Sequence, residues 1–174
     1  MSIAEIDFKT LTLRDALDLA ILIEEEAKER YQEFADQMDL HHTPDAAAFF
    51  RLMVWNEEKH REELAERRGR LFGDAPVGVT RAMLFDIEAP DYDQARAFMT
   101  AREAMQAALV SETKAHAFFV AALPRVQDED VRKLFEELRD EEVEHQGLVK
   151  KEMAKLPPDS PLRPDDFADE PVGH

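Results

Sequence analysis

Apolar residues recur three and four positions apart along four stretches of the chain, the spacing found on one face of an α-helix. These stretches predict helices over about 13–38, 44–68, 93–123 and 128–155. Residues typical of helix starts precede three of these stretches: Thr12, Thr43 with Pro44, and Asp128. Two residues typical of helix ends, Gly69 and Pro124, follow the second and third stretches. The chain has only five glycines and is rich in alanine, leucine, glutamate, lysine and arginine, so we expect an all-α protein.

The lengths of the connections predict how these helices are arranged. A short loop over 39–43 separates the first two helices, whereas 69–92 form a long connection. That length suits a crossover along a bundle, with a short helix at about 79–84. We therefore predict a four-helix bundle of two helical hairpins joined by a long crossover. It forms one domain over 1–156, followed by a tail over 157–174 rich in proline and acidic residues.

Charged or ionisable residues interrupt the apolar face of every predicted helix. Six of them are carboxylates or imidazoles: Glu24, Glu57, His60, Glu112, Glu142 and His145. The second and fourth helices each carry them as a Glu-x-x-His pattern, which puts both side chains on one face, with Cβ atoms about 5 to 6 Å apart. One such pattern alone is more typical of a solvated helix face. Their joint alignment with the apolar faces favours a metal site instead.

An internal repeat relates the two predicted hairpins. An offset of 88 positions aligns Glu24 with Glu112 and Tyr31 with Phe119, and an offset of 85 aligns the two Glu-x-x-His patterns. Because the offsets nearly agree, the hairpins follow the same plan. The inward faces of two such hairpins meet at the axis of a bundle, so we expect the six residues to lie at similar depth.

Four carboxylates buried together need compensating positive charge, because desolvation and mutual repulsion otherwise protonate them. Two divalent cations supply that charge when two neutral imidazoles complete the site. Nitrogen and carboxylate ligands suit iron or manganese, and zinc also binds such a set.

The amino-acid composition agrees with cation binding and excludes some kinds of metal site. The 39 acidic and 22 basic residues give a formal charge of −17, which repels nucleic acid and anionic membranes and attracts cations. The acidic excess is also common in soluble proteins without metals. The chain has no cysteine, which excludes disulfides and thiolate-held iron sites. We find neither a signal peptide nor an apolar run of membrane-spanning length, so we expect a cytoplasmic protein.

These residues resemble the rubrerythrin branch of the ferritin-like superfamily over about 13–155. The resemblance rests on the Glu-x-x-His patterns and on two glutamates that each precede an aromatic residue by seven positions, Glu24 before Tyr31 and Glu112 before Phe119. It implies a non-haem di-iron centre, with manganese or zinc as alternative metals, in a homodimeric bundle. In ferritin-like di-iron proteins the glutamates of the Glu-x-x-His patterns, here Glu57 and Glu142, bridge the metals. The histidines then each cap one ion, and the other two glutamates are terminal ligands.

The resemblance also predicts the reaction. We expect a di-iron oxidoreductase that reduces hydrogen peroxide, or that oxidises Fe(II) with peroxide or dioxygen, and an external electron donor serves the first reaction. The alternative is an iron-binding, storage-delivery or iron-sensing bundle without significant turnover. Tyr31 is expected to hydrogen-bond a ligand carboxylate, with core packing as the alternative.

Two features depart from the family pattern. Many rubrerythrins carry a rubredoxin domain, which a sequence without cysteine cannot form. They also have a further glutamate three residues after the ligand of the third helix, where this chain has Ala115 followed by His116. His116 can either contact the metal in its place or lie at the surface.

Overall fold

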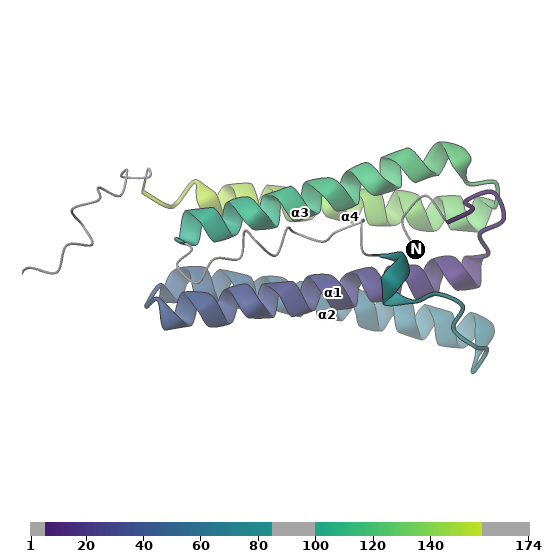
Figure 1. Cartoon of the computed structure of the whole chain (residues 1–174), viewed down its shortest axis with the longest axis horizontal. Coiled ribbons are helices and arrows are strands. Elements are labelled where there is room, and N and C mark those ends of the chain that lie inside the picture. Colours follow the sequence, from purple (N-terminus) through teal and green to yellow (C-terminus); the bar gives the residue numbers. More distant parts are fainter. Residues whose placement is uncertain (1–5, 85–99, 158–174) are drawn as a thin grey trace, which may run out of the picture.

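Four long helices form the body of the protein in the computed structural model, which describes residues 6–84 and 100–157 (Figure 1). The helices are α1 (Leu13–Leu40), α2 (Pro44–Phe72), α3 (Ala101–Ala122) and α4 (Glu129–Met153). Two 3₁₀ turns accompany them, η2 (Arg81–Met83) and η4 (Leu123–Arg125). The all-α bundle is therefore confirmed.

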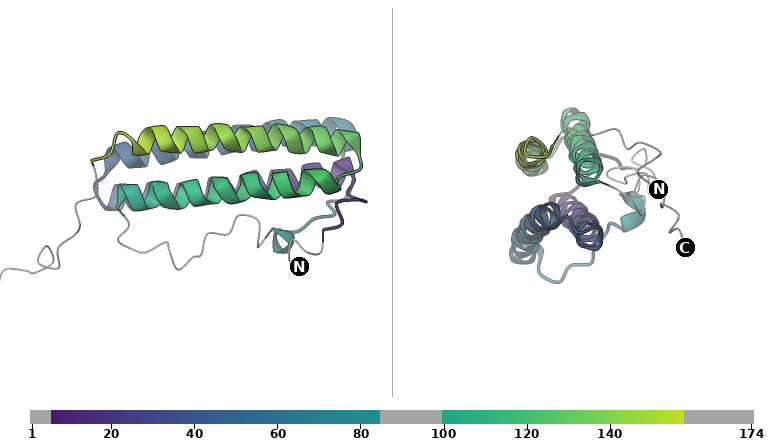
Figure 2. Two further views of the ribbon diagram at one scale, coloured as in Figure 1. Left: turned by 90° about the horizontal axis from the view of Figure 1, so that it is seen from above. Right: turned by 90° about the vertical axis from the view of Figure 1, so that its left-hand side faces the viewer.

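The helices pair as two hairpins, α1 with α2 and α3 with α4, and the hairpins lie side by side along their length (Figure 2). Thr12 caps α1 by accepting the backbone N–H of Asp15 at 3.2 Å, and Asp128 caps α4 by accepting two backbone N–H groups, as predicted. None of the helices within the described ranges is both long and apolar enough to cross a membrane.

One predicted helix end was wrong, and one helix start has a cap that was not predicted. Helix α2 does not stop at Gly69 but continues to Phe72, because Gly69 fits a helix interior and Gly73 caps the end with a φ of 53°. Helix α3 begins at Ala101, after an extended Thr100 that forms a reciprocal capping box with Glu103. The sequence pattern missed this cap, and the predicted start at Asp93 lies outside the described residues.

The beginning of the crossover is held against the first hairpin by two arginines. Arg68 of α2 pairs with the buried Asp18 of α1 (Nε to Oδ1, 2.8 Å) and donates to the Gly73 carbonyl at 2.6 Å. Arg81 lies in the 3₁₀ turn found where a short helix was predicted at about 79–84, and it makes a two-pronged ion pair with Glu29 of α1 at 2.8 and 2.9 Å. The chain after α2 therefore folds back along α1, as a crossover requires. The rest of that connection and the tail after Pro157 lie outside the described residues.

The core consists of two apolar clusters with a polar layer between them. The Phe135 cluster includes Ile23, Leu64, Phe118 and Leu138, and the Phe50 cluster includes Ala27, Met53, Ala108 and Val149. Each of the four long helices contributes to both clusters, and on each helix the change from one cluster to the other falls at the inward residues identified from the sequence. The apolar faces thus place those residues at one level of the bundle.

Candidate metal centre

The polar layer contains all six carboxylates and imidazoles that the sequence singles out. Five are buried, with 2 to 6% of their surface exposed: Glu24, Glu57, Glu112, Glu142 and His145. His60 is the exception, because 19% of its side chain is exposed. The predicted placement at a common depth agrees with the structure.

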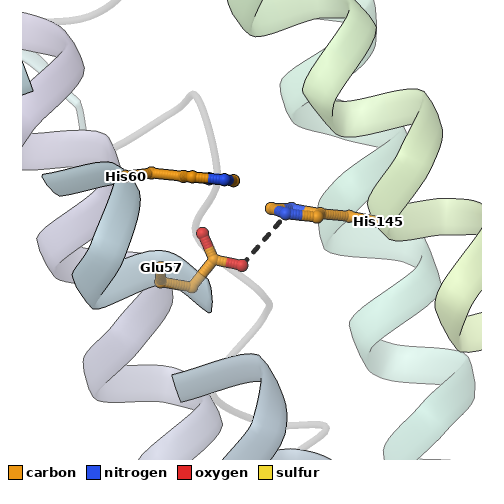
Figure 3. A group of neighbouring side chains, drawn as sticks. All are labelled: Glu57, His60 and His145. Atoms are coloured by element: carbon orange, nitrogen blue, oxygen red, sulfur yellow. Dashed lines mark ion pairs between the residues drawn. The ribbon is translucent and has the colours of Figure 1, made fainter. Parts of the chain in front are cut away.

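His145 is the centre of one half of the layer. Its Nδ1 lies 3.3 Å from Oε1 of Glu57 on α2 (Figure 3). It also lies 3.4 Å from Oε2 of Glu112 on α3, so carboxylates from two helices approach the imidazole of α4. Burial alone lowers the pKa of His145, but the hydrogen bond to Glu112 and the charges of Glu57, Glu112 and Glu141 raise it to about 9. At neutral pH the imidazole is therefore protonated and offsets part of the surrounding negative charge.

His60 is the centre of the other half, which is more open. Its Nδ1 lies 3.9 Å from Glu24 Oε2 and 3.9 Å from Glu141 Oε2. Burial and the nearby charge of His145 lower its pKa, so His60 is neutral at neutral pH and able to offer a lone pair. The rings of His60 and His145 face each other across the bundle, nearly parallel, with centroids 5.3 Å apart (Figure 3).

Glu141 is the residue that sequence reasoning missed. It is one-third exposed, and burial, followed by the charges of Glu57, Glu137 and Glu63, raises its pKa to about 7 against a lowering by His145. On α4 it stands one position from Glu142 and four positions before His145. The spacing of four places it on the same helix face as His145, a signal that was present in the sequence.

The ligand atoms of these residues fall into three overlapping groups, within each of which they lie no more than 4.8 Å apart. The groups are Glu57, His60 and His145; Glu24, His60 and Glu141; and Glu112, Glu142 and His145. Because each histidine belongs to two of the groups, the groups form one continuous set of donors. His116 belongs to none of those found among the described residues.

Two enclosed atoms of this layer lack hydrogen bonds within the part of the chain that the structure describes. They are Glu57 Oε1 and His60 Nδ1, both almost inaccessible to water. Buried polar atoms normally have a hydrogen-bond partner, and a bound cation satisfies such atoms equally well. Glu57 Oε1 still has its ion-pair contact with His145 Nδ1 at 3.3 Å, whereas the neutral His60 Nδ1 is left unsatisfied by the described residues. The donor set therefore fits metal ions bound by oxygen and nitrogen.

Tyr31 and Ala115, two further residues considered in the sequence analysis, have apolar surroundings. The Tyr31 ring is fully buried and stacks on Phe50 with centroids 6.1 Å apart, and its hydroxyl has no hydrogen-bond partner among the described residues. Its predicted bond to a ligand carboxylate stays a prediction. Ala115 is fully buried one turn after Glu112 and contributes only a methyl group to the layer.

Comparison with known proteins agrees with this geometry. A rubrerythrin family model matches residues 15–153. The chain also matches the crystal structure of an uncharacterised conserved protein from Magnetospirillum magnetotacticum MS-1, with 29% identity and a TM-score of 0.70 over 86% of this chain and 99% of that one. A search of curated proteins found no match. The family match over most of the chain, together with the fold and its layer of carboxylates and imidazoles, shows that this protein belongs to the rubrerythrin family.

Proposed function

We propose that the protein is a non-haem di-iron oxidoreductase that reduces hydrogen peroxide, or that oxidises Fe(II) with peroxide or dioxygen. The observation that carries the proposal is the continuous set of donors around His60 and His145, enclosed between two apolar clusters. A cytoplasmic location and a homodimeric assembly belong to the proposal as well.

The composition of the donor set supports two divalent ions. Glu24, Glu57, Glu112 and Glu142 supply four negative charges when ionised, and two divalent cations balance them if both imidazoles are neutral. Oxygen and nitrogen donors without thiolates suit iron and manganese. By the pattern of ferritin-like di-iron proteins, Glu57 and Glu142 would help to hold both ions, while His60 and His145 would each hold one.

The protein's own residues prepare this site for binding. His145 must give up its proton before Nδ1 or Nε2 can coordinate an ion, so metal binding at neutral pH displaces that proton. The apolar clusters exclude water and strengthen the attraction between carboxylates and cations. Since His60 and Glu141 are the exposed members of the layer, ions and small oxidants approach from their side.

Iron bound there would supply the electrons, and reduction of one peroxide molecule to two waters would consume two electrons and two protons. In peroxide reduction an external donor must return the iron to Fe(II). In Fe(II) oxidation the incoming Fe(II) is itself the electron source.

The test is anaerobic loading of metal-free protein with Fe(II), followed by stoichiometric peroxide or air-saturated buffer. We expect about two irons per chain and a change in the ultraviolet and visible spectrum within seconds of adding one of the oxidants. Failure to bind iron contradicts the proposal. Tight and reversible binding without oxidation supports the alternative, an iron-binding or iron-delivering bundle. Glu144→Gln serves as a control, because Glu144 is an exposed glutamate of the same helix.

A further inference from the structure

The two halves of the polar layer are not equivalent. The half around His145 is closed, since Glu112, Glu142 and His145 are all buried. The half around His60 combines the buried Glu24 with Glu141, whose side chain is 37% exposed. The open half thus has a carboxylate that the six-residue site does not use.

The internal repeat provides no counterpart for Glu141. The offset of 85 that aligns Glu57 with Glu142 aligns Asn56 with Glu141. A carboxylate at this position is therefore specific to the second hairpin, and it reaches across the bundle to His60 of the first hairpin.

The distances between the potential ligand atoms around His60 are slightly longer than those between the ligand atoms of a bound metal ion. His60 Nδ1 lies 3.9 Å from one oxygen of Glu24 and 3.9 Å from one oxygen of Glu141. Direct hydrogen bonds require about 3 Å. Metal bonds of about 2.0 to 2.2 Å hold neighbouring ligand atoms about 3 to 3.5 Å apart, so shifts below about 1 Å are sufficient.

Two further observations point to a ligand at this place. His60 Nδ1 is enclosed and has no hydrogen-bond partner in the described part of the chain. Oε1 of Glu57, a side chain 97% buried, also lacks a hydrogen bond in that part of the chain, and it forms an ion pair with His145 Nδ1 at 3.3 Å (Figure 3).

We propose that Glu141 is a seventh metal ligand, which coordinates the ion held by Glu24 and His60 at the open side of the layer. The assignment rests on the proposed function, because it assumes that the layer binds two ions. Glu141 completes the ligands of one ion only, and the ion held by Glu112 and His145 does not depend on it.

Binding of Mn(II) to metal-free full-length protein under argon tests this assignment, with free Mn(II) counted by electron paramagnetic resonance. Wild type and Glu144→Gln are expected to bind two ions per chain. Glu141→Gln is expected to keep one ion at wild-type affinity and to bind the other at least about tenfold more weakly, by analogy with losses around metal sites. Circular dichroism checks that each variant keeps its helices, and the exposure of Glu141 favours retention of the fold.

Two double variants identify the affected ion. When Glu141→Gln is added to Glu24→Gln, the affinity for the one remaining ion should be unchanged. When Glu141→Gln is added to Glu112→Gln, the last tightly bound ion should be lost. The assignment is overturned if Glu141→Gln binds both ions with affinities within twofold of those of Glu144→Gln. It is also overturned if adding Glu141→Gln to Glu24→Gln removes the last bound ion. Wild-type protein that binds no ion overturns the proposed function itself and the assignment with it, a result that does not involve Glu141.

Discussion

Glu142→Gln should stabilise the metal-free protein although it removes a side chain from the centre of the fold. Glu142 is 6% exposed, and one of its oxygens lies within 4.8 Å of a carboxylate oxygen of Glu112. Two unit charges at that separation would repel by about 3.5 kcal/mol at an effective dielectric constant of about 20, and without metal this repulsion is relieved in part by protonation of the carboxylates. The protonated His145 offsets part of this repulsion, so we expect the uncharged amide to raise the free energy of unfolding by about 1 to 2 kcal/mol.

The same substitution should weaken the response to metal. An ion present at about 100 times its Kd stabilises the native protein by about 2.7 kcal/mol, and the melting temperature of a protein of this size rises by about 2 to 4 °C per kcal/mol. Wild type should therefore gain at least about 5 °C from Mn(II). Glu142→Gln should gain much less, because it lacks a proposed bridging carboxylate.

Differential scanning calorimetry of both proteins, with Mn(II) and with chelator, measures the two effects together. Wild type should melt below Glu142→Gln without metal and above it with metal. Glu144→Gln makes the same change of charge at an exposed position of α4 and should behave as wild type in both conditions. A Glu142→Gln variant with a lowered metal-free melting temperature and the full metal-induced rise would contradict both expectations.

Three further predictions concern protonation, the crossover and the glycines of α2. The raised pKa of His145 means that its protonation stabilises the metal-free fold fully below pH 6.5, and that this contribution is lost as the pH rises through about 9. Metal binding at pH 7.5 should accordingly release about one proton per chain, measured by calorimetry in buffers of different ionisation enthalpy; no release contradicts this. Arg68→Met breaks a buried ion pair and should lower the melting temperature by roughly 10 °C, whereas Arg67→Met, at an exposed pair, should change it by about 2 °C or less. Gly73→Ala should destabilise by about 1 kcal/mol, because φ is 53° there, while Gly69→Ala should stabilise by about 0.5 to 1 kcal/mol; equal effects in denaturant titrations contradict the assigned helix end.

The fold follows from the sequence where apolar spacing and caps agree. The start of α1 at Leu13 was predicted, and that of α4 at Glu129 was predicted to within one residue, because Thr12 and Asp128 mark them locally. The end of α2 was not predictable from Gly69, since a glycine is tolerated inside a helix that tertiary contacts stabilise. Arg68 is such a contact, and its pairing with Asp18 connects residues 50 positions apart that no local pattern relates.

The depth of the candidate site was predictable for a similar reason. Each of the six inward residues interrupts an apolar face, and the structure brings all six into one layer; their role as ligands stays a proposal. The difference between the halves was not predictable, because the repeat describes them as equal. Only the packing of α2 against α4 shows that His60 is partly exposed and that Glu141 lies beside it.

The central claim is that the layer around His60 and His145 binds two metal ions. Crystals of metal-free protein soaked anaerobically in Fe(II) test it most directly, through anomalous differences measured on either side of the iron absorption edge. We predict two iron peaks per chain within this layer, bounded by Glu57 and Glu142. No peak in the layer, or iron only at the protein surface, would contradict the account.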